Sequence, residues 1–537
     1  MTAVAESRQR VVLVCGRIVD SLERNAGIAA AMALILIFVI ALGQSADNLL
    51  WYNEIVTLKT ASLPQWSDVW NFYAHGLDTT GPVPSLIARV GLMLPIGPEL
   101  GSRLPFTVAY LVMCLCVFGF VHRRYPAGYA LATLIFALIQ SFFYFATDAR
   151  AYALVLAGAG VAMLCWQSAV SGRHRPWSLL GLWFGLAFAL DAHAFAIFLF
   201  VPFALAQFVQ DFKHKKPDWP TWAALLLFPA GFLPLLHGQL LAKKIYGTNF
   251  SHQPDLQSMF SSYQDFLLGG VIRLIILLLV ATGAVLLQRQ SRLRFFELKT
   301  RGFSLPEWIL VATLALLPLY VVPASYRIHA YAPRYVVSCY IGLVILAIGA
   351  AAEAARRNRF AGAVLFALLL LSSSFNRIGV FAQGLHALVH PGRVHKQLEA
   401  RYNGYAWVQF IEQSGLLIVA DNPNVYSQVD YYVGSRLEHR LIGITDIRDV
   451  KKYPLSGTHQ LNFLCFSKPF SYQTADLADF LLEHPHFLLI ASRDEYGWLH
   501  RYLIDQQEAG NASFACLGPD CAGPDTNVYD VHFMKLP

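Results

Sequence analysis

Carboxylates and cations lie among aromatic residues in the segment 47–105, and this combination of side chains suits binding a phosphate and deprotonating a hydroxyl. A positioned carboxylate can take a proton from an attacking hydroxyl, and a guanidinium can bind phosphate oxygens through two parallel hydrogen bonds. Glu54 carries the most weight, because it follows Trp51 in a stretch (49–61) that predicts an amphipathic helix. A solvated loop position is the alternative for any single acid. The candidates here are Asp47, Glu54, Asp78 and Arg103.

Three further segments contain both charged and aromatic residues: FATDARAYALVLAG (145–158), LDAHAF (190–195) and ASYRIHAYAPRYVVS (324–338). Charges and tyrosines at helix ends also serve as interfacial anchors or structural ion pairs, so each residue alone has a plain alternative. Taken together, they predict a cation-rich polar site. Its candidate residues are Asp148, Arg150, Tyr152, Asp191, His193, Arg327, Arg334 and Tyr335, with Lys243 and Lys244 as two further cations.

The elements that position these residues are apolar helices. The chain has 537 residues, of which 56% are hydrophobic and 14% charged, whereas soluble domains average about 25% charged. This composition excludes a soluble enzyme, a disordered chain and a nucleic-acid binder. Eleven apolar segments predict a polytopic membrane protein. They are 25–43, 104–121, 127–146, 151–169, 177–190, 193–208, 221–237, 270–287, 306–323, 335–353 and 360–375, and the pair 177–190 and 193–208 also fits one long or broken helix.

The basic residues predict the orientation. Residues 1–376 carry a net charge of +11 and residues 377–537 a net charge of −4. With the N-terminus in the cytoplasm, 19 of the 28 basic residues of the first part fall in inner segments, as the positive-inside rule requires. The other nine fall on the outer side, where the positive-inside rule does not account for them: Lys59, Arg89, Arg103, Arg150, Lys243, Lys244, Arg273, Arg327 and Arg334.

Two domains follow from this pattern. Residues 1–376 form the membrane domain, whose outer loop 44–103 carries amphipathic helices, one of them (82–94) too short to span and therefore interfacial. An odd number of spans places residues 377–537 on the extracytoplasmic (periplasmic) side of the membrane as an α/β domain. Its buried strands are predicted at 416–420 and 487–491, and a helix at 474–484.

The order of these motifs resembles the GT-C glycosyltransferases, in particular the bacterial relatives of protein O-mannosyltransferases and aminoarabinose transferases. The resemblance covers about residues 20–350. The family's Asp-Glu pair falls on Asn53-Glu54, and its Pro-Pro stretch falls on LDTTGPVPSL (77–86), where the prolines are not adjacent. The other matching motifs are SRLP (102–105), ARAY (149–152), LDAHAF (190–195) and PRYV (333–336).

The resemblance implies a GT-C-like membrane domain of about 11 transmembrane helices. It also implies a membrane glycosyltransferase of the hexosyl or pentosyl class, with inversion at the anomeric carbon. The expected donor is a sugar on a polyprenyl phosphate. The acceptor hydroxyl belongs to a lipid, glycan or protein at the outer face of the cytoplasmic (inner) membrane, and no nucleic acid takes part.

The resemblance also implies residue roles. Glu54 is the expected general base, with Asp47 and Asp78 in reserve. Arg150 and Arg334 are preferred for the donor phosphate, followed by Arg327, Lys243, Lys244 and Arg103. Further substrate-site residues are Asn53, Tyr152, His193 and Tyr335. No cofactor is assigned, because Asn53 in place of an acid does not support the divalent metal that two carboxylates would hold.

Two other functions are compatible with a protein that has many membrane spans and charged residues on the outer side that the positive-inside rule does not explain. A transporter or flippase of lipid-linked sugars predicts internal repeats and charges near mid-membrane, whereas the sequence has no internal repeat and its charges cluster at one face. A non-catalytic relative that binds lipid-linked sugar is the other alternative, because Asn53 departs from the family's acidic pair.

Overall fold

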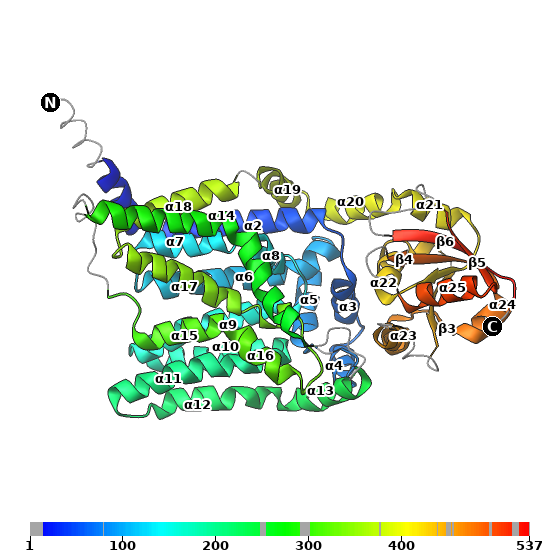
Figure 1. The fold of residues 1–537 in the computed structure, drawn as a ribbon, viewed down its shortest axis with the longest axis horizontal. Coiled ribbons are helices and arrows are strands. Elements are labelled where there is room, and N and C mark those ends of the chain that lie inside the picture. The colour runs from blue at the N-terminus through cyan, green and yellow to red at the C-terminus, as the bar shows by residue number, and fades with distance from the viewer. Residues whose placement is uncertain are drawn as a thin grey trace.

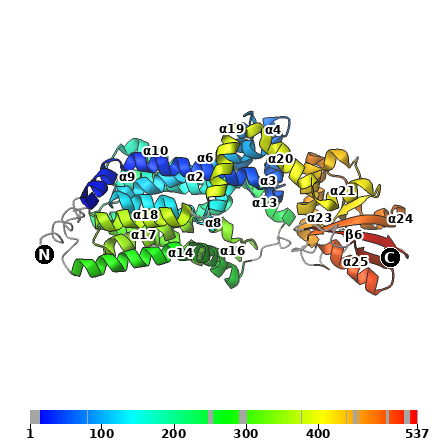
Figure 2. The same cartoon turned by 90° about the horizontal axis from the view of Figure 1, so that it is seen from above.

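The computed structural model describes residues 14–78, 80–246, 254–289, 301–374, 377–437, 439–446, 453, 456–492, 497–517 and 526–535. A bundle of helices forms the first part of the molecule, and a smaller α/β domain lies beyond one end of it (Figures 1 and 2). Parts of the predicted inner segments 1–24 and 288–305 fall outside the described residues.

The bundle confirms the predicted class of a polytopic helical membrane protein. Six of the described helical segments are long and apolar enough to cross a membrane, or up to nine where each bent pair counts as one span. The other two predicted segments are α10 and α17, which lie alongside the rest (Figure 1). The helices are α2 (Ala26–Asp47), α6 (Pro98–His122), α7 (Ala127–Phe136) with α8 (Gln140–Phe143) and η1 (Tyr144–Ala146), α9 (Ala151–Val170), α10 (Arg175–Ala192), η2 (Ala194–Leu199) with α11 (Phe200–His214), α12 (Trp219–Leu227) with η3 (Phe228–Phe232) and α13 (Leu233–Tyr246), α14 (Leu256–Arg289), α15 (Leu305–Ala315) with α16 (Leu317–Ser325), α17 (Cys339–Ala354) and α18 (Arg359–Ser374).

Breaks in the helices place polar residues at one end of the bundle. The pair α7 and α8–η1 bends by 72°. The uncertain pair of predicted segments is two helices, because α10 ends at Ala192 and the chain turns at His193 before η2 begins. Arg334 lies in the short helix η6 (Pro333–Val336), just before α17. These three breaks lie in or next to the segments 145–158, 190–195 and 324–338, which contain both charged and aromatic residues.

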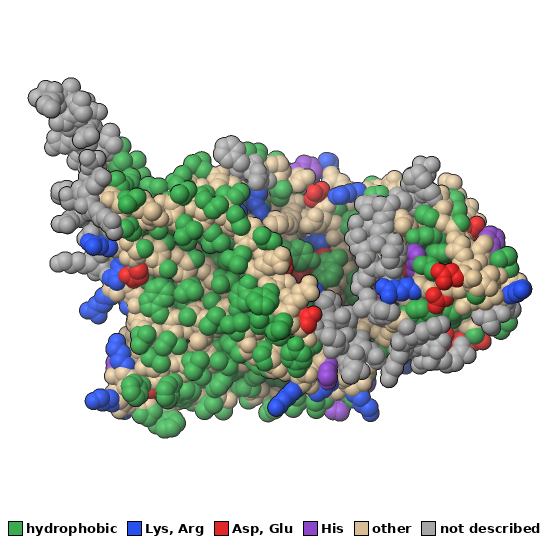
Figure 3. Space-filling view, viewed as in Figure 1, with side chains coloured by type: hydrophobic (Ala, Val, Ile, Leu, Met, Phe, Trp, Pro, Cys, Tyr) green, Lys and Arg blue, Asp and Glu red, His purple; other side chains and the backbone are tan. Residues whose placement is uncertain are grey.

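Apolar side chains cover most of the visible face of the bundle in Figure 3, and Lys and Arg gather at the end away from the α/β domain. Small residues allow close helix packing inside. A Cβ atom on Gly158 of α9 would come within 2.4 Å of the Gly185 carbonyl oxygen of α10, so these helices approach through glycines, as is common where lipid replaces water.

The loop 44–103, which the sequence predicts on the outer side, folds into three short helices, α3 (Tyr52–Ala61), α4 (Trp66–Ala74) and α5 (Val83–Leu92), which confirms helices in the stretches 49–61 and 82–94. Arg89 of α5 donates hydrogen bonds to the carbonyl oxygens of Ala61, Leu63 and Pro64, at 3.1, 2.5 and 3.0 Å. This arginine therefore fixes the turn between α3 and α4.

The C-terminal domain is built on a six-stranded sheet of order β3-β2-β1-β4-β6-β5. Strands β3, β2, β1 and β4 are parallel to one another. Strand β6 pairs antiparallel with β4, and β5 pairs antiparallel with β6 at the edge of the sheet. Its strands are β1 (Ile418–Ala420), β2 (Leu441–Thr445), β3 (Thr474–Asp476), β4 (His486–Ser492), β5 (Ala512–Cys516) and β6 (Thr526–Phe533). Its helices are α20 (Pro391–Asn403), α21 (Ala406–Gln413), α22 (Pro423–Tyr432), η7 (Gly434–Arg436), α23 (Ser456–Phe470), α24 (Leu477–Glu483) and α25 (Trp498–Glu508).

The sequence predicts the central strands of this sheet well, because β1 and β4 are short apolar runs buried between helices. The stretch 474–484 is only partly helical, since its first three residues form β3. Helix α19 (Ile378–Val389) follows the predicted domain boundary at residue 377 and still packs on α2. A Cβ on Gly384 would come within 1.9 Å of the Val39 carbonyl oxygen.

Helix α3 lies between the two domains (Figure 1). The Leu50 amide donates to the Tyr432 hydroxyl at 2.9 Å, and the Gln428 side chain donates to the Leu50 carbonyl at 3.0 Å. Lys59 of α3 pairs with Asp430 of α22. The α/β domain is thus docked on the loop that carries most of the candidate acids.

Candidate active site

A cavity of about 280 Å³ lies between the outer loop of the membrane domain and the α/β domain. Seven of the residues predicted for the site line it: Asn53, Asp78, Arg150, Tyr152, His193, Arg334 and Tyr335. They come from α3, the α4–α5 loop, the start of α9, the turn after α10, and η6. The breaks between helices therefore bring together residues that lie up to 282 positions apart in the sequence.

Two arginines give the cavity its positive charge. The Arg150 side chain is 7% exposed, and its Nη1 donates to the Asn53 carbonyl oxygen at 3.3 Å and to the Thr57 hydroxyl at 3.1 Å. The Nε atoms of both Arg150 and Arg334 are buried and have no hydrogen-bond partner among the described residues. Because an unpartnered buried donor is costly, these guanidinium groups suit an anionic ligand in the cavity.

His193 is a neutral donor beside these cations. Burial, together with Arg150 and Arg334, lowers the pKa of His193 to about 3, so the imidazole is uncharged at neutral pH. Its Nδ1 accepts a hydrogen bond from the Phe195 amide at 3.3 Å, which leaves the proton on Nε2. The ring contacts Tyr335, with ring centroids 4.7 Å apart.

Asp78 is the one carboxylate among the described residues that line the cavity. Its Oδ2 lies 3.5 Å from Arg150 Nη1, and its Oδ1 accepts the Thr80 amide hydrogen at 2.9 Å. Its side chain is 10% exposed. One carboxylate oxygen is held by the backbone and the other faces a cation, so the group is positioned to accept a proton inside the cavity.

The structure argues against Glu54 as the general base, because Glu54 does not line the cavity and is 1% exposed. Arg103 grips its carboxylate with Nε at 2.7 Å and Nη2 at 2.5 Å. The backbone amides of Ala149 and Trp51 donate to it at 3.0 and 3.3 Å. Arg103 is 2% exposed, and besides Glu54 it donates hydrogen bonds to three backbone carbonyl oxygens. Its guanidinium group is therefore not available to bind a donor phosphate in the cavity.

Four other predicted site residues lie outside the cavity. Asp47 contacts Arg401, with Oδ1 and Nη1 3.4 Å apart, and both side chains are more than half exposed. Lys244 and Arg327 are exposed on the surface, and Lys243 borders a neighbouring groove. Arg150 and Arg334 line the cavity, whereas Asp47 and these three cations do not.

Asn53 and Trp51 complete the wall formed by the start of α3. Asn53 occupies the cavity side of this helix, where a carboxylate would face the ligand, while the adjacent Glu54 faces the protein interior. The Trp51 indole donates to Asp148 at 3.0 Å, and burial and the nearby Glu54 charge raise the pKa of Asp148. Asp148 therefore orients an aromatic wall of the site.

An apolar groove of about 320 Å³ adjoins the cavity and shares His193, Tyr246 and Tyr335 with it. The rest of its lining is almost wholly apolar and includes Phe195, Phe198, Phe232, Leu236, Leu240 and Ile328. The polar cavity and the groove thus meet at one tyrosine pair and one histidine.

The α/β domain forms the roof of the cavity, which the sequence did not predict. The roof residues are Asn424 at the start of α22 and Thr458, His459, Asn462 and Phe466 of α23. His459 is 6% exposed, its Nδ1 has no hydrogen-bond partner among the described residues, and burial lowers its pKa to about 4. A neutral imidazole and two amides therefore face the cations of the membrane domain.

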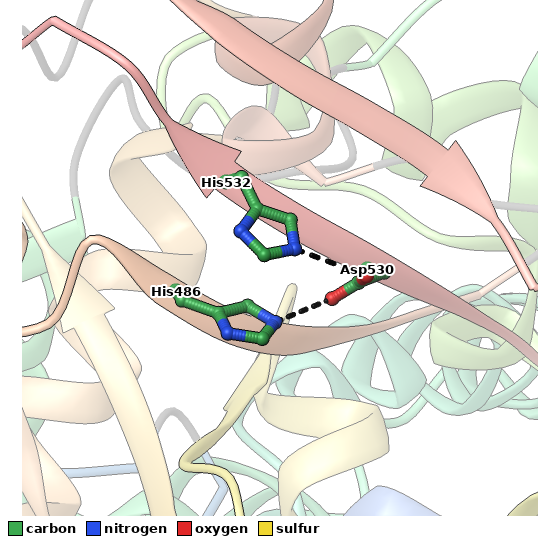
Figure 4. A group of neighbouring side chains, drawn as sticks. All are labelled: His486, Asp530 and His532. Atoms are coloured by element: carbon green, nitrogen blue, oxygen red, sulfur yellow. Dashed lines mark hydrogen bonds and ion pairs between the residues drawn. The ribbon is translucent and has the colours of Figure 1, made fainter.

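One group of side chains in the described part of the chain has metal-ligand character. His486 and His532 each place Nε2 on Asp530, at 2.9 and 3.2 Å, on neighbouring strands β4 and β6 (Figure 4). All three side chains are partly exposed to solvent. None of them lines the cavity, so they have no part in its chemistry.

Solved structures that resemble this chain include two of ArnT from Cupriavidus metallidurans. The apo structure has a TM-score of 0.49 and 14% identity, and the structure bound to undecaprenyl phosphate has a TM-score of 0.48 and 15% identity. Each match covers 94% of this chain and 97% of that chain. No protein family and no curated protein matches the sequence. The chemistry of this protein is therefore inferred from the residues that line the cavity.

Proposed function

We propose that this protein is a membrane glycosyltransferase that moves a sugar from a polyprenyl-phosphate donor to an acceptor hydroxyl at the outer face of the cytoplasmic membrane. One observation carries the proposal. A cavity with two buried arginines and a single carboxylate opens beside an apolar groove, and His193 and Tyr335 line both. A ligand with a phosphate joined to a long apolar chain fits this pair of spaces.

The groove takes the first isoprene units of the lipid. It lies between η2, α13 and the segment before η6, and its exposed apolar residues include Ile197, Leu236 and Leu240. Such residues meet acyl chains in a membrane, so a polyprenyl chain enters sideways from the bilayer. Tyr335 and His193 then lie at the junction between the chain and the phosphate.

Arg150 and Arg334 hold the phosphate. In the reaction, the acceptor oxygen forms a bond to the anomeric carbon while the bond from that carbon to the phosphate oxygen breaks. The electron pair of the broken bond stays on the leaving polyprenyl phosphate, and the arginines stabilise the added charge. Asp78 takes the proton of the attacking hydroxyl. The neutral His193 donates a hydrogen bond without adding a third cation.

The roof residues bind the sugar. Once the arginines hold the phosphate, the attached sugar fills the part of the cavity under α22 and α23. Asn424, His459 and Asn462 are uncharged hydrogen-bonding groups, which suit hydroxyl groups better than an anion, and Phe466 offers an apolar ring face. The α/β domain therefore selects the donor sugar.

The proposal is tested by incubating the purified protein with a panel of undecaprenyl-phosphate monosaccharides and measuring released undecaprenyl phosphate. Arg150→Ala and Arg334→Ala should each weaken the binding of undecaprenyl phosphate by roughly 10- to 100-fold, because each removes charged hydrogen bonds to the phosphate. Arg327→Gln is the control, since Arg327 is exposed and does not line the cavity. Equal binding by all four proteins would contradict the phosphate site.

The roof is tested by the contribution of the sugar to binding. We expect His459→Ala and Asn462→Ala to leave the affinity for undecaprenyl phosphate unchanged. They should lower the affinity for the preferred undecaprenyl-phosphate monosaccharide by roughly three- to tenfold, the effect of one neutral hydrogen bond. His484→Ala, on a partly exposed histidine of the same domain, should match the native protein. A parallel loss for both ligands would show that the variants damage the phosphate site instead.

A further inference from the structure

Two arginines converge on one carbonyl oxygen away from the proposed active site. Arg273 of α14 and Arg377, just before α19, both donate from Nη2 to the Leu138 carbonyl, at 3.3 and 2.7 Å. Arg273 also donates to the Ser373 hydroxyl at 3.3 Å, and Arg377 to the Gln140 side chain at 3.0 Å. The two guanidinium groups are thus neighbours in space although 104 positions separate them in the sequence.

The pair borders a hollow of about 520 Å³ that shares no lining residue with the cavity of the proposed active site. The hollow lies where membrane helices end. Asn48 follows α2, Leu138 lies in the break between α7 and α8, and Ser373 lies at the end of α18. Helix ends at a common level mark the boundary of the bilayer, which is where lipid phosphates lie.

The positive charge in this hollow is uncompensated. Within the described residues, neither Arg273 nor Arg377 has a carboxylate at ion-pair distance, and the buried Nε of Arg273 has no hydrogen-bond partner. Asp47 is the one acid in the lining, and it contacts Arg401. Two adjacent cations that are partly withdrawn from water repel each other, so an anion between them would relieve this cost.

The hollow opens toward lipid along α14. The most apolar stretch of α14 has a mean hydropathy of 2.6 and is only 17% buried inside the protein. Leu268 and Ile272, which line the hollow, are both 65% exposed. An apolar wall beside a pair of arginines at the level of the helix ends matches a lipid with acyl chains and an anionic phosphate headgroup.

We infer that Arg273 and Arg377 bind the phosphate of an anionic lipid. The planar guanidinium fork suits phosphate oxygens, and the lining also contains Gln44, Gln140 and Gln383, whose amide groups can bind headgroup hydroxyls. A phosphatidylglycerol-type headgroup has this chemistry, whereas a zwitterionic headgroup brings a cation of its own next to the arginine pair. The inference does not depend on glycosyl transfer.

Native mass spectrometry of the full-length protein in detergent, titrated with phosphatidylglycerol or phosphatidylcholine, tests the site. The double variant Arg273→Gln, Arg377→Gln should bind phosphatidylglycerol roughly 10- to 100-fold more weakly than the native protein, because charged hydrogen bonds to the phosphate are lost. Phosphatidylcholine should bind weakly to both proteins. Arg327→Gln, which removes an exposed cation that does not line the hollow, should bind phosphatidylglycerol as the native protein does.

A second arm separates a lipid from a free phosphate, because both present the same oxygens to the arginines. Inorganic phosphate at millimolar concentration should not displace phosphatidylglycerol if the apolar wall contributes to binding, and full displacement would overturn the lipid assignment. Unchanged phosphatidylglycerol binding in the double variant would overturn the site itself. If that variant does not fold, Arg273→Lys and Arg377→Lys keep the charge and should still retain phosphatidylglycerol over phosphatidylcholine; loss of this preference would count against the site.

Discussion

Asp78→Asn is expected to lower sugar transfer by roughly 10²- to 10⁴-fold, the usual contribution of a positioned general base. The amide has the size of the carboxylate and can still accept the Thr80 amide hydrogen that Asp78 accepts at 2.9 Å, but it does not take a proton from an attacking hydroxyl. Release of undecaprenyl phosphate from the preferred donor measures the loss. Binding of undecaprenyl phosphate should persist, because Arg150 and Arg334 are intact.

Asp68→Asn is the matched control for this experiment. Asp68 belongs to the same outer loop, and its carboxylate accepts a backbone hydrogen bond from Gln65 at 3.0 Å, but it does not line the cavity. This variant should turn over donor at the native rate. If Asp78→Asn kept more than about a tenth of native turnover, below the usual effect of removing a base, Asp78 would not be the base, and a water or the acceptor itself would have to release the proton.

The membrane helices and the central strands could be predicted because they depend on local patterns. Long apolar runs form spans wherever they lie in the chain, and the runs at 416–420 and 487–491 fit the middle of a parallel sheet. Which of two neighbouring residues faces the cavity, in contrast, could not be predicted from a local pattern. Asn53 and Glu54 are adjacent on α3, and only the position of Arg103, 49 positions later, decides which of them faces the cavity.

The roof of the cavity could not be predicted for a related reason. His459 lies in a helix of the α/β domain that has no marked apolar or charged motif in the sequence. Its place depends on contacts that dock this domain on α3, such as the hydrogen bond from the Leu50 amide to the Tyr432 hydroxyl across 382 positions. Docking of this kind arises from the summed contacts of two surfaces, and no short motif records it.

Glu54→Ala is expected to destabilise the protein by about 3–5 kcal/mol, the cost of leaving a buried charge without its partner. Arg103 would keep three carbonyl acceptors but lose the carboxylate that holds Nε and Nη2 at 2.7 and 2.5 Å. The Ala149 and Trp51 amides would lose their acceptor too. Thermal unfolding in detergent measures the change, and the variant should unfold at a clearly lower temperature than the native protein.

A surface ion pair provides the comparison for this effect. Asp20 pairs with Arg359 at 2.8 Å, but its side chain is 54% exposed, so Asp20→Ala should cost no more than about 1 kcal/mol. Activity per folded molecule separates structure from catalysis at Glu54. Glu54→Gln keeps the size of the side chain and one acceptor oxygen, and its side chain does not line the cavity, so its folded fraction should transfer sugar at a rate near that of the native protein. A folded Glu54→Gln protein with the same deep loss of turnover as Asp78→Asn would return the base to Glu54, and Asp78 would then serve only to orient Arg150.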